Sequence, residues 1–204
     1  MAPVRPVGYE DRLTLVDHLT ELRGRIIISI LAFALAFLIK MPAFPFHGWM
    51  PDTYRNMPLP ALAVFSGVVS KVAAYGFLKL VLPLFPAATN DWNVALLVLA
   101  VISILYGSIQ AFTQTNARLI LGYSSIAQLG FIVLGIFALE EKGAQGALFQ
   151  MLNHGLVVVP LFLIIGVIAV RAGGSESMRE LGGMAFRAPV LAGLFLIAAT
   201  AGWL

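Results

Sequence analysis

The chain has 204 residues, of which 60% are hydrophobic and only 11% are charged, whereas about a quarter of the residues in an ordinary soluble domain are charged. Together with a mean hydropathy of +0.92, this composition excludes a water-soluble globule. The net charge of +3 is spread along the chain, so the sequence does not predict nucleic-acid binding. It contains no cysteine and only three scattered histidines, which excludes thiolate and disulfide chemistry and predicts no metal site.

Apolar runs recur along the sequence at lengths close to those needed to cross a hydrocarbon core of about 30 Å. They do not alternate with polar residues as the strands of a membrane β-barrel would. The fold class predicted is therefore all-α, a polytopic transmembrane helical bundle of about five or six spans. The expected spans cover residues 26–39, 60–83, 94–112, 117–139 and 147–170, and a last apolar run begins at Pro189. That run is still apolar at Leu204, so the sequence looks cut within a helix.

The first expected span is short, and the charges around it conflict. Residues 26–39 would extend only about 21 Å as a helix, and a stretch with three prolines, residues 42–51, follows them. Arginines before residue 26 and the basic loop that begins at Lys40 both favour the cytoplasmic side, although one span separates them. Either residues 26–39 are re-entrant, or the first part of the chain does not belong with the rest.

Lys71 lies near the middle of the second expected span. A lysine at that depth costs roughly 2.5–3.5 kcal/mol to insert, so an incidental lysine is not expected there. Such a group can take up and release a proton, which makes Lys71 the first candidate for proton translocation. A lysine paired to a neighbouring helix for packing is the structural alternative. Gly67 and Gly76 flank it and are consistent with one interrupted helix.

His154 is the second candidate, because an imidazole within an apolar span can pass a proton through its two nitrogens. Gln150 lies one turn earlier on the same helix face, and Pro160 removes a helix hydrogen bond one turn later. The alternative is a core histidine that is hydrogen-bonded across helices.

Arg118 opens the fourth expected span, with Ser125 on the same face and Gln128 nearby. An arginine stays protonated, so it could set the field around Lys71 but could not release a proton itself. An interfacial anchor is the alternative interpretation.

His47 and Asp52 lie in the proline-rich loop and are interpreted as supporting residues. His47 is expected to organise that loop, with a direct proton role as the alternative. No nucleophile–base pair and no nucleotide-binding motif is present in the sequence, so no catalytic residue is predicted.

Several blocks of the sequence are distinctive when taken in order. They read KMPAFPFHGWMPD at 40–52, GVVSK at 67–71, AFTQT at 111–115, YSS at 123–125 and QMLNHG at 150–155. Together they resemble the proton-conducting membrane subunits of respiratory NADH:quinone oxidoreductase, and most closely the subunit M branch. This family also includes Mrp-type cation/proton antiporter subunits. The resemblance covers residues 32–204.

The resemblance implies a fragment of a subunit that moves protons through buried lysine and histidine, coupled to electron transfer elsewhere in the complex. Lys71 would carry protons, and its usual glutamate partner would lie in an upstream span. No cofactor would be bound by this chain, while the complex would use NADH and quinone. Other membrane subunits and the lipid bilayer would be its partners, in the bacterial plasma (inner) membrane. The chain departs from the family at two positions, with Arg118 where a lysine is common and Tyr54 where a second loop histidine is usual.

The N-terminal part resembles a different family. Residues 15–23 read LVDHLTELR and precede an apolar run, which is similar to the start of the twin-arginine translocase component TatC. This predicts a chimera with a TatC-like segment over 1–37 and a partial antiporter-like domain over 38–204. Residues 10–23 would then form an amphipathic helix outside the membrane. Two alternative functions follow, a TatC-related protein-export component and a monovalent cation/proton antiporter subunit.

Overall fold

The structure, a computed structural model, describes residues 15–202, and its regular elements are helices. In chain order these are α1 (Leu15–Lys40), α2 (Met50–Asn56), α3 (Leu59–Val64), η1 (Phe65–Val69), α4 (Ser70–Gly76), η2 (Phe77–Val81), α5 (Leu82–Leu84), α6 (Pro86–Thr113), α7 (Ala117–Phe137), α8 (Glu141–Arg171), α9 (Met184–Arg187) and α10 (Pro189–Ala201). Four helical stretches are long and apolar enough to cross a membrane, namely Leu59–Leu84, α6, α7 and α8, and α10 is a shorter apolar helix. The predicted all-α transmembrane bundle is confirmed, and the chain is an integral membrane protein.

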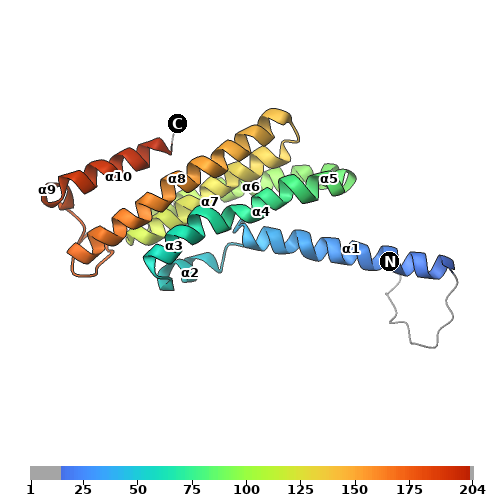
Figure 1. Cartoon of the computed structure of the whole chain (residues 1–204), viewed down its shortest axis with the longest axis horizontal. Coiled ribbons are helices and arrows are strands. Elements are labelled where there is room, and N and C mark those ends of the chain that lie inside the picture. Colours follow the sequence, from blue (N-terminus) through green and yellow to red (C-terminus); the bar gives the residue numbers. More distant parts are fainter. Residues whose placement is uncertain (1–14, 203–204) are drawn as a thin grey trace.

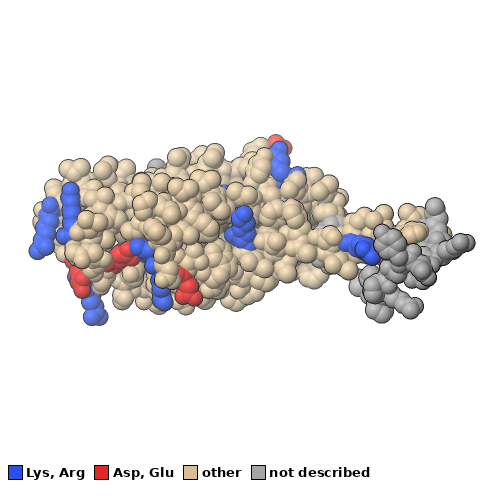
Figure 2. Space-filling model, turned by 60° about the horizontal axis from the view of Figure 1, so that its bottom comes forward, with Lys and Arg blue, Asp and Glu red and all other residues tan. Residues whose placement is uncertain are grey.

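The four long stretches lie side by side, and α7 is the central one (Figure 1). Helix α7 contacts α6, α8 and α2, which explains why it has the largest buried share of the four stretches. Helix α10 lies along α8, whereas much of α1 extends beyond the bundle (Figure 1). On the face seen in Figure 2, charged side chains gather mainly toward the end where α9 lies, and uncharged residues cover most of the remaining surface.

Two of the spans begin earlier than their apolar runs predict. Helix α6 starts at Pro86 rather than at residue 94, and α8 starts at Glu141 rather than at residue 147. A proline in the first turn is pre-organised for the helix and needs no hydrogen bond from its nitrogen. A glutamate in the first turn interacts favourably with the helix dipole. Polar first turns therefore extend both helices beyond their apolar parts.

The stretch Leu59–Leu84 holds Lys71, and its predicted interruption takes an unexpected form. The chain does not leave the helical conformation at this point. Instead, the π-helical segments η1 and η2 flank the short α4, which carries Lys71. A π segment changes the hydrogen-bond register without unwinding the helix, and such segments are frequent at functional sites.

At its N-terminal end the described chain forms one continuous helix, α1, and not a separate amphipathic helix followed by a short span. Residues 10–14 of that predicted helix lie outside the described residues. Leu19 and Leu22 of that predicted helix are 58% and 53% exposed, so these two leucines do not pack into the bundle. Only the C-terminal part of α1 packs closely, with Phe37 near Phe77 at a ring-centroid distance of 5.7 Å.

Candidate functional site

Lys71 is buried in α4, and its ammonium is held by a backbone carbonyl. The side chain is 8% exposed, and Nζ donates a hydrogen bond to the carbonyl oxygen of Ser66 in η1. The Ser70 hydroxyl donates to the same oxygen at 2.7 Å. Between residues 15 and 202, neither of the two ion pairs that form involves Lys71. A dipole rather than a carboxylate therefore faces this buried cation.

Ser66 also links Lys71 to Tyr54 of α2. The Tyr54 hydroxyl donates to the Ser66 hydroxyl oxygen at 2.8 Å, and the tyrosine is only 1% exposed. Burial raises the pKa of Tyr54 to about 12, although the hydrogen bond with the Ser66 hydroxyl opposes this shift. At neutral pH the phenol is therefore protonated and available as a donor.

Two glycines bring the Lys71 helix against the His154 helix. A Cβ atom added to Gly155 of α8 would lie 2.9 Å from the carbonyl oxygen of Gly67 in η1, which is closer than a carbon and an oxygen can pack. The two backbones therefore approach more closely than any larger residue would allow. Ser66 and His154 are the sequence neighbours of this contact, so it brings the two candidate helices together at the site.

His154 is 6% exposed, and its Nδ1 atom has no hydrogen-bond partner among the described residues. It lines a cavity of about 200 Å³ together with Ser125, Gln128 and Gln150. Across this cavity Gln150 Nε2 donates to Gln128 Oε1 at 2.5 Å, which joins α8 to α7. The cavity has these polar side chains on an otherwise largely apolar wall, and its size leaves room for several water molecules. The structure thus brings together four residues that the sequence singled out from two separate spans.

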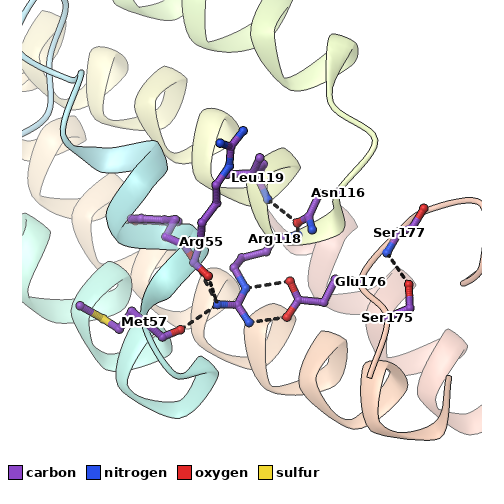
Figure 3. A network of polar contacts seen from close by, with 9 residues as sticks. Arg55, Met57, Asn116, Arg118, Leu119, Ser175, Glu176 and Ser177 are labelled. Atoms are coloured by element: carbon purple, nitrogen blue, oxygen red, sulfur yellow. Dashed lines mark hydrogen bonds and ion pairs between the residues drawn. The ribbon is translucent and has the colours of Figure 1, made fainter. Parts of the chain in front are cut away.

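Arg118 takes part in the densest polar cluster of the site (Figure 3). Its Nε donates to Glu176 Oε2 at 2.9 Å, and its Nη2 donates to Glu176 Oε1. Its Nη1 donates to three carbonyl oxygens near the end of α2, those of Tyr54, Arg55 and Met57, at 3.1, 3.2 and 2.7 Å. We call these contacts the Arg118 clasp. It joins the start of α7, the end of α2 and the loop between α8 and α9.

Neighbouring backbone contacts strengthen the clasp. Asn116 caps α7, because its side chain accepts hydrogen bonds from the backbone nitrogens of Arg118 and Leu119. The backbone nitrogen of Ala117 donates to the Glu176 carbonyl at 3.0 Å. The sequence does not indicate Glu176 as a site residue, because nothing in the spacing between positions 118 and 176 shows that they pair.

The loop residues His47 and Asp52 lie apart from this group. His47 is 8% exposed and packs against aromatic rings, with Tyr106 at 4.5 Å and Phe44 at 5.6 Å between centroids. Burial lowers the pKa of His47 below its ordinary value of 6.5. Asp52 is an exposed residue in the first turn of α2. The structure therefore gives His47 a place in the packing of the loop and does not bring Asp52 to Lys71.

Comparison with known proteins adds to this geometry. Residues 11–202 match the family described as NADH:quinone oxidoreductase/Mrp antiporter, transmembrane. The chain belongs to this family. It is 41% identical over 167 residues to NADH-quinone oxidoreductase subunit M of Rickettsia prowazekii, and 39% identical over 188 residues to subunit M of Rickettsia felis. These matches cover 82% and 90% of the chain but 34% and 38% of the relatives, so the chain spans a little over a third of their length.

Solved structures of the family have the same arrangement of helices. Respiratory complex I from Thermus thermophilus with bound NADH contains a chain that matches with a TM-score of 0.79 and 35% identity, over 85% of this chain and 37% of that one. The Mrp complex from Dietzia sp. DQ12-45-1b matches with a TM-score of 0.79 and 29% identity, over 85% of this chain and 32% of that one.

The predicted TatC-like segment is not supported by these matches. The family match begins at residue 11, so it includes most of the segment that resembles TatC. Helix α1 also crosses the predicted boundary at residues 37 and 38 without interruption. The division of the chain at that boundary stays a prediction.

Proposed function

We propose that the chain moves protons as part of the membrane subunit M of a respiratory NADH:quinone oxidoreductase. The observation that supports this most is the burial of Lys71 in the middle of a span, with a carbonyl oxygen as its partner and no paired carboxylate in the described part of the chain. A cation held in this way is costly to keep charged. Small changes in the electrostatic potential around Lys71 can therefore make its amine take up or release a proton.

The other residues take separate roles in this proposal. His154 is the second proton-carrying group, and protons reach it through the cavity that it shares with the polar side chains of Ser125, Gln128 and Gln150. Arg118 contributes a fixed positive charge. His47 and Asp52 support the loop from outside this route.

The rest of the complex would supply the driving reaction. Electrons would pass from NADH to quinone in other subunits, and this chain would bind no redox cofactor itself. Its partners would be the neighbouring membrane subunits and the lipid, in the bacterial inner membrane. This assignment rests on the family and on subunit M relatives.

The test is proton uptake by inverted membrane vesicles during NADH oxidation, with the substitutions made in the subunit within its natural complex. Lys71→Met should lower the protons taken up per NADH about tenfold or more, because a midplane group that changes charge is lost. Lys71→Arg should fail as well, because arginine keeps its proton. Lys79→Met is the matched control, since Lys79 is an exposed lysine on the same composite helix. Normal uptake in Lys71→Met would refute the proposal.

A monovalent cation/proton antiporter subunit is the second candidate. It is favoured by the match to the Mrp complex, whose TM-score equals that of the match to complex I. In vesicles that carry a preformed proton gradient, adding Na⁺ would then release protons without NADH. The antiporter would be favoured if Lys71→Met abolished this Na⁺-driven proton release but left NADH-driven proton uptake unchanged.

A further inference from the structure

Ser66 is held from two sides by two different residues. Its hydroxyl oxygen accepts a hydrogen bond from the Tyr54 phenol at 2.8 Å, and its carbonyl oxygen accepts from the ammonium of Lys71. Ser66 itself is fully buried. The phenol of Tyr54 is therefore one residue away from the ammonium of Lys71, although Tyr54 belongs to a different helix.

Ser66 lies in the π-helical segment η1, where the backbone departs from the regular helix. Among the described residues, the phenol is the one hydrogen-bond partner of its hydroxyl. Without the phenol, that hydroxyl would be free to turn toward a backbone carbonyl of its own helix, as serines in helices often do. The Ser66 carbonyl would then keep the hydrogen bond from the Ser70 hydroxyl at 2.7 Å but lose the support that the phenol gives to its residue.

Tyr54 is itself held firmly by contacts that do not involve Ser66. Its ring packs edge-on against Phe162 of α8 at a centroid distance of 5.8 Å. It also lies against Gly122 of α7, where an added Cβ atom would come within 3.0 Å of the ring. The Tyr54 carbonyl accepts a hydrogen bond from the Arg118 clasp at 3.1 Å. A continuous series of contacts thus runs from the clasp through Tyr54 and Ser66 to Lys71.

We infer that Tyr54 is a positioning residue for Lys71. Its hydroxyl orients Ser66 so that the Ser66 carbonyl receives the Lys71 ammonium, and the Arg118 clasp holds Tyr54 in the position from which it does so. This inference rests on the proton role proposed for Lys71 and adds to it a residue that touches Lys71 only through Ser66.

A double-mutant cycle in the intact complex tests this inference, with protons taken up per NADH oxidised as the readout. Tyr54→Phe removes only the hydroxyl, and Ser66→Ala removes only its partner. Each should lower uptake roughly three- to tenfold, and the double variant should pump like either single variant because both remove the same bond. Tyr106→Phe is the control, because no hydrogen bond of its hydroxyl is found among the described residues.

Several outcomes would overturn the inference. Uptake by Tyr54→Phe equal to that of the parent would do so, and so would losses that multiply in the double variant. If Tyr54→Phe failed to assemble, Ser66→Ala would decide, and failure of both to assemble would leave a structural role in place of positioning. A Lys71→Met variant that does not pump, beside a Tyr54→Phe variant that pumps normally, would remove only this inference. Normal pumping in both would remove the proposed function as well.

Discussion

Lys71 and Arg118 are two sheltered cations with very different surroundings. Lys71 meets a carbonyl oxygen and joins neither ion pair formed within residues 15–202, whereas Arg118 meets both oxygens of Glu176 and three carbonyls. The first arrangement leaves the charge free to change. The second holds a permanent charge in a fixed position. Lys71 is therefore a candidate proton carrier, whereas Arg118 is a structural cation.

The clasp changes what is expected of a lysine at position 118. The resemblance to the family implies that Arg118→Lys is tolerated, because a lysine is common at that position and keeps the positive charge. A lysine cannot bind both oxygens of Glu176 and also reach the carbonyls at the end of α2, because it lacks the planar fork of donors. We expect Arg118→Lys and Arg118→Ala to lower the free energy of unfolding by about 1–3 kcal/mol.

Thermal denaturation of the purified complex, followed through release of this subunit, measures the effect. Arg55→Lys is the control, since Arg55 has an exposed side chain on the same helix end. If the Arg118→Lys variant has the same melting temperature as the parent, the clasp does not stabilise the fold.

His47 provides a test by pH. Because burial lowers its pKa below 6.5, the folded loop holds the neutral imidazole at acid pH values where the unfolded chain binds a proton. The unfolded state then binds more protons, so stability falls as the pH drops through about 6.5. We expect His47→Gln to make the melting temperature less dependent on pH between about 7.5 and 5.5, compared with the parent and with His18→Gln in the exposed part of α1. An unchanged pH dependence would contradict this role.

At this scale the sequence predicts some residues well and others not at all. Lys71 and His154 stand out because a lysine and an imidazole are costly in apolar runs. Ser66 and Glu176 do not stand out, because a serine is unremarkable in a helix and a loop glutamate is normally solvated. Their importance comes from partners that only the folded chain brings to them.

Helix packing at the site depends on the contact between Gly67 and Gly155. Because the atom that an added Cβ would meet is a backbone oxygen at 2.9 Å, the helices themselves must move apart. We expect Gly155→Ala to destabilise the bundle by about 1–3 kcal/mol and to reduce proton uptake. Gly146→Ala is a matched control on the same helix, with open space around the added atom. It should be neutral or slightly stabilising, since alanine favours the helix.

Thermal denaturation and proton uptake by vesicles can both be measured on the Gly155→Ala and Gly146→Ala variants. A Gly155→Ala variant that is as stable and active as Gly146→Ala would show that the close contact is not required. Apolar run lengths predict the four stretches that are long enough to cross a membrane, but this contact depends on how α8 crosses η1. The π-helical segments have no sequence signal comparable to a proline, so an interruption could be expected near Lys71 but not its form.

The molecule as a whole presents an apolar exterior. Large side chains such as Phe112, Leu156 and Val170 are 92%, 77% and 79% exposed, and uncharged residues predominate on the face shown in Figure 2. In an integral membrane protein such surfaces meet lipid or the apolar helices of neighbours. The polar groups of the site lie inside this exterior, where α7 meets α8 and the Lys71 helix.

The Arg118 clasp also bears on the order in which the chain is made. Its cation, its carbonyl acceptors and its carboxylate come from three segments that are far apart in sequence, and Glu176 is the last of them to leave the ribosome. Membrane helices enter the bilayer in turn as they are synthesised, so Lys71 and Tyr54 are inserted long before the carboxylate exists. The anchor at the end of α2 is therefore completed late in biosynthesis. A nascent chain that ends before the α8–α9 loop would contain Arg118 and its carbonyl acceptors at the end of α2, but not the carboxylate that binds the other side of the guanidinium.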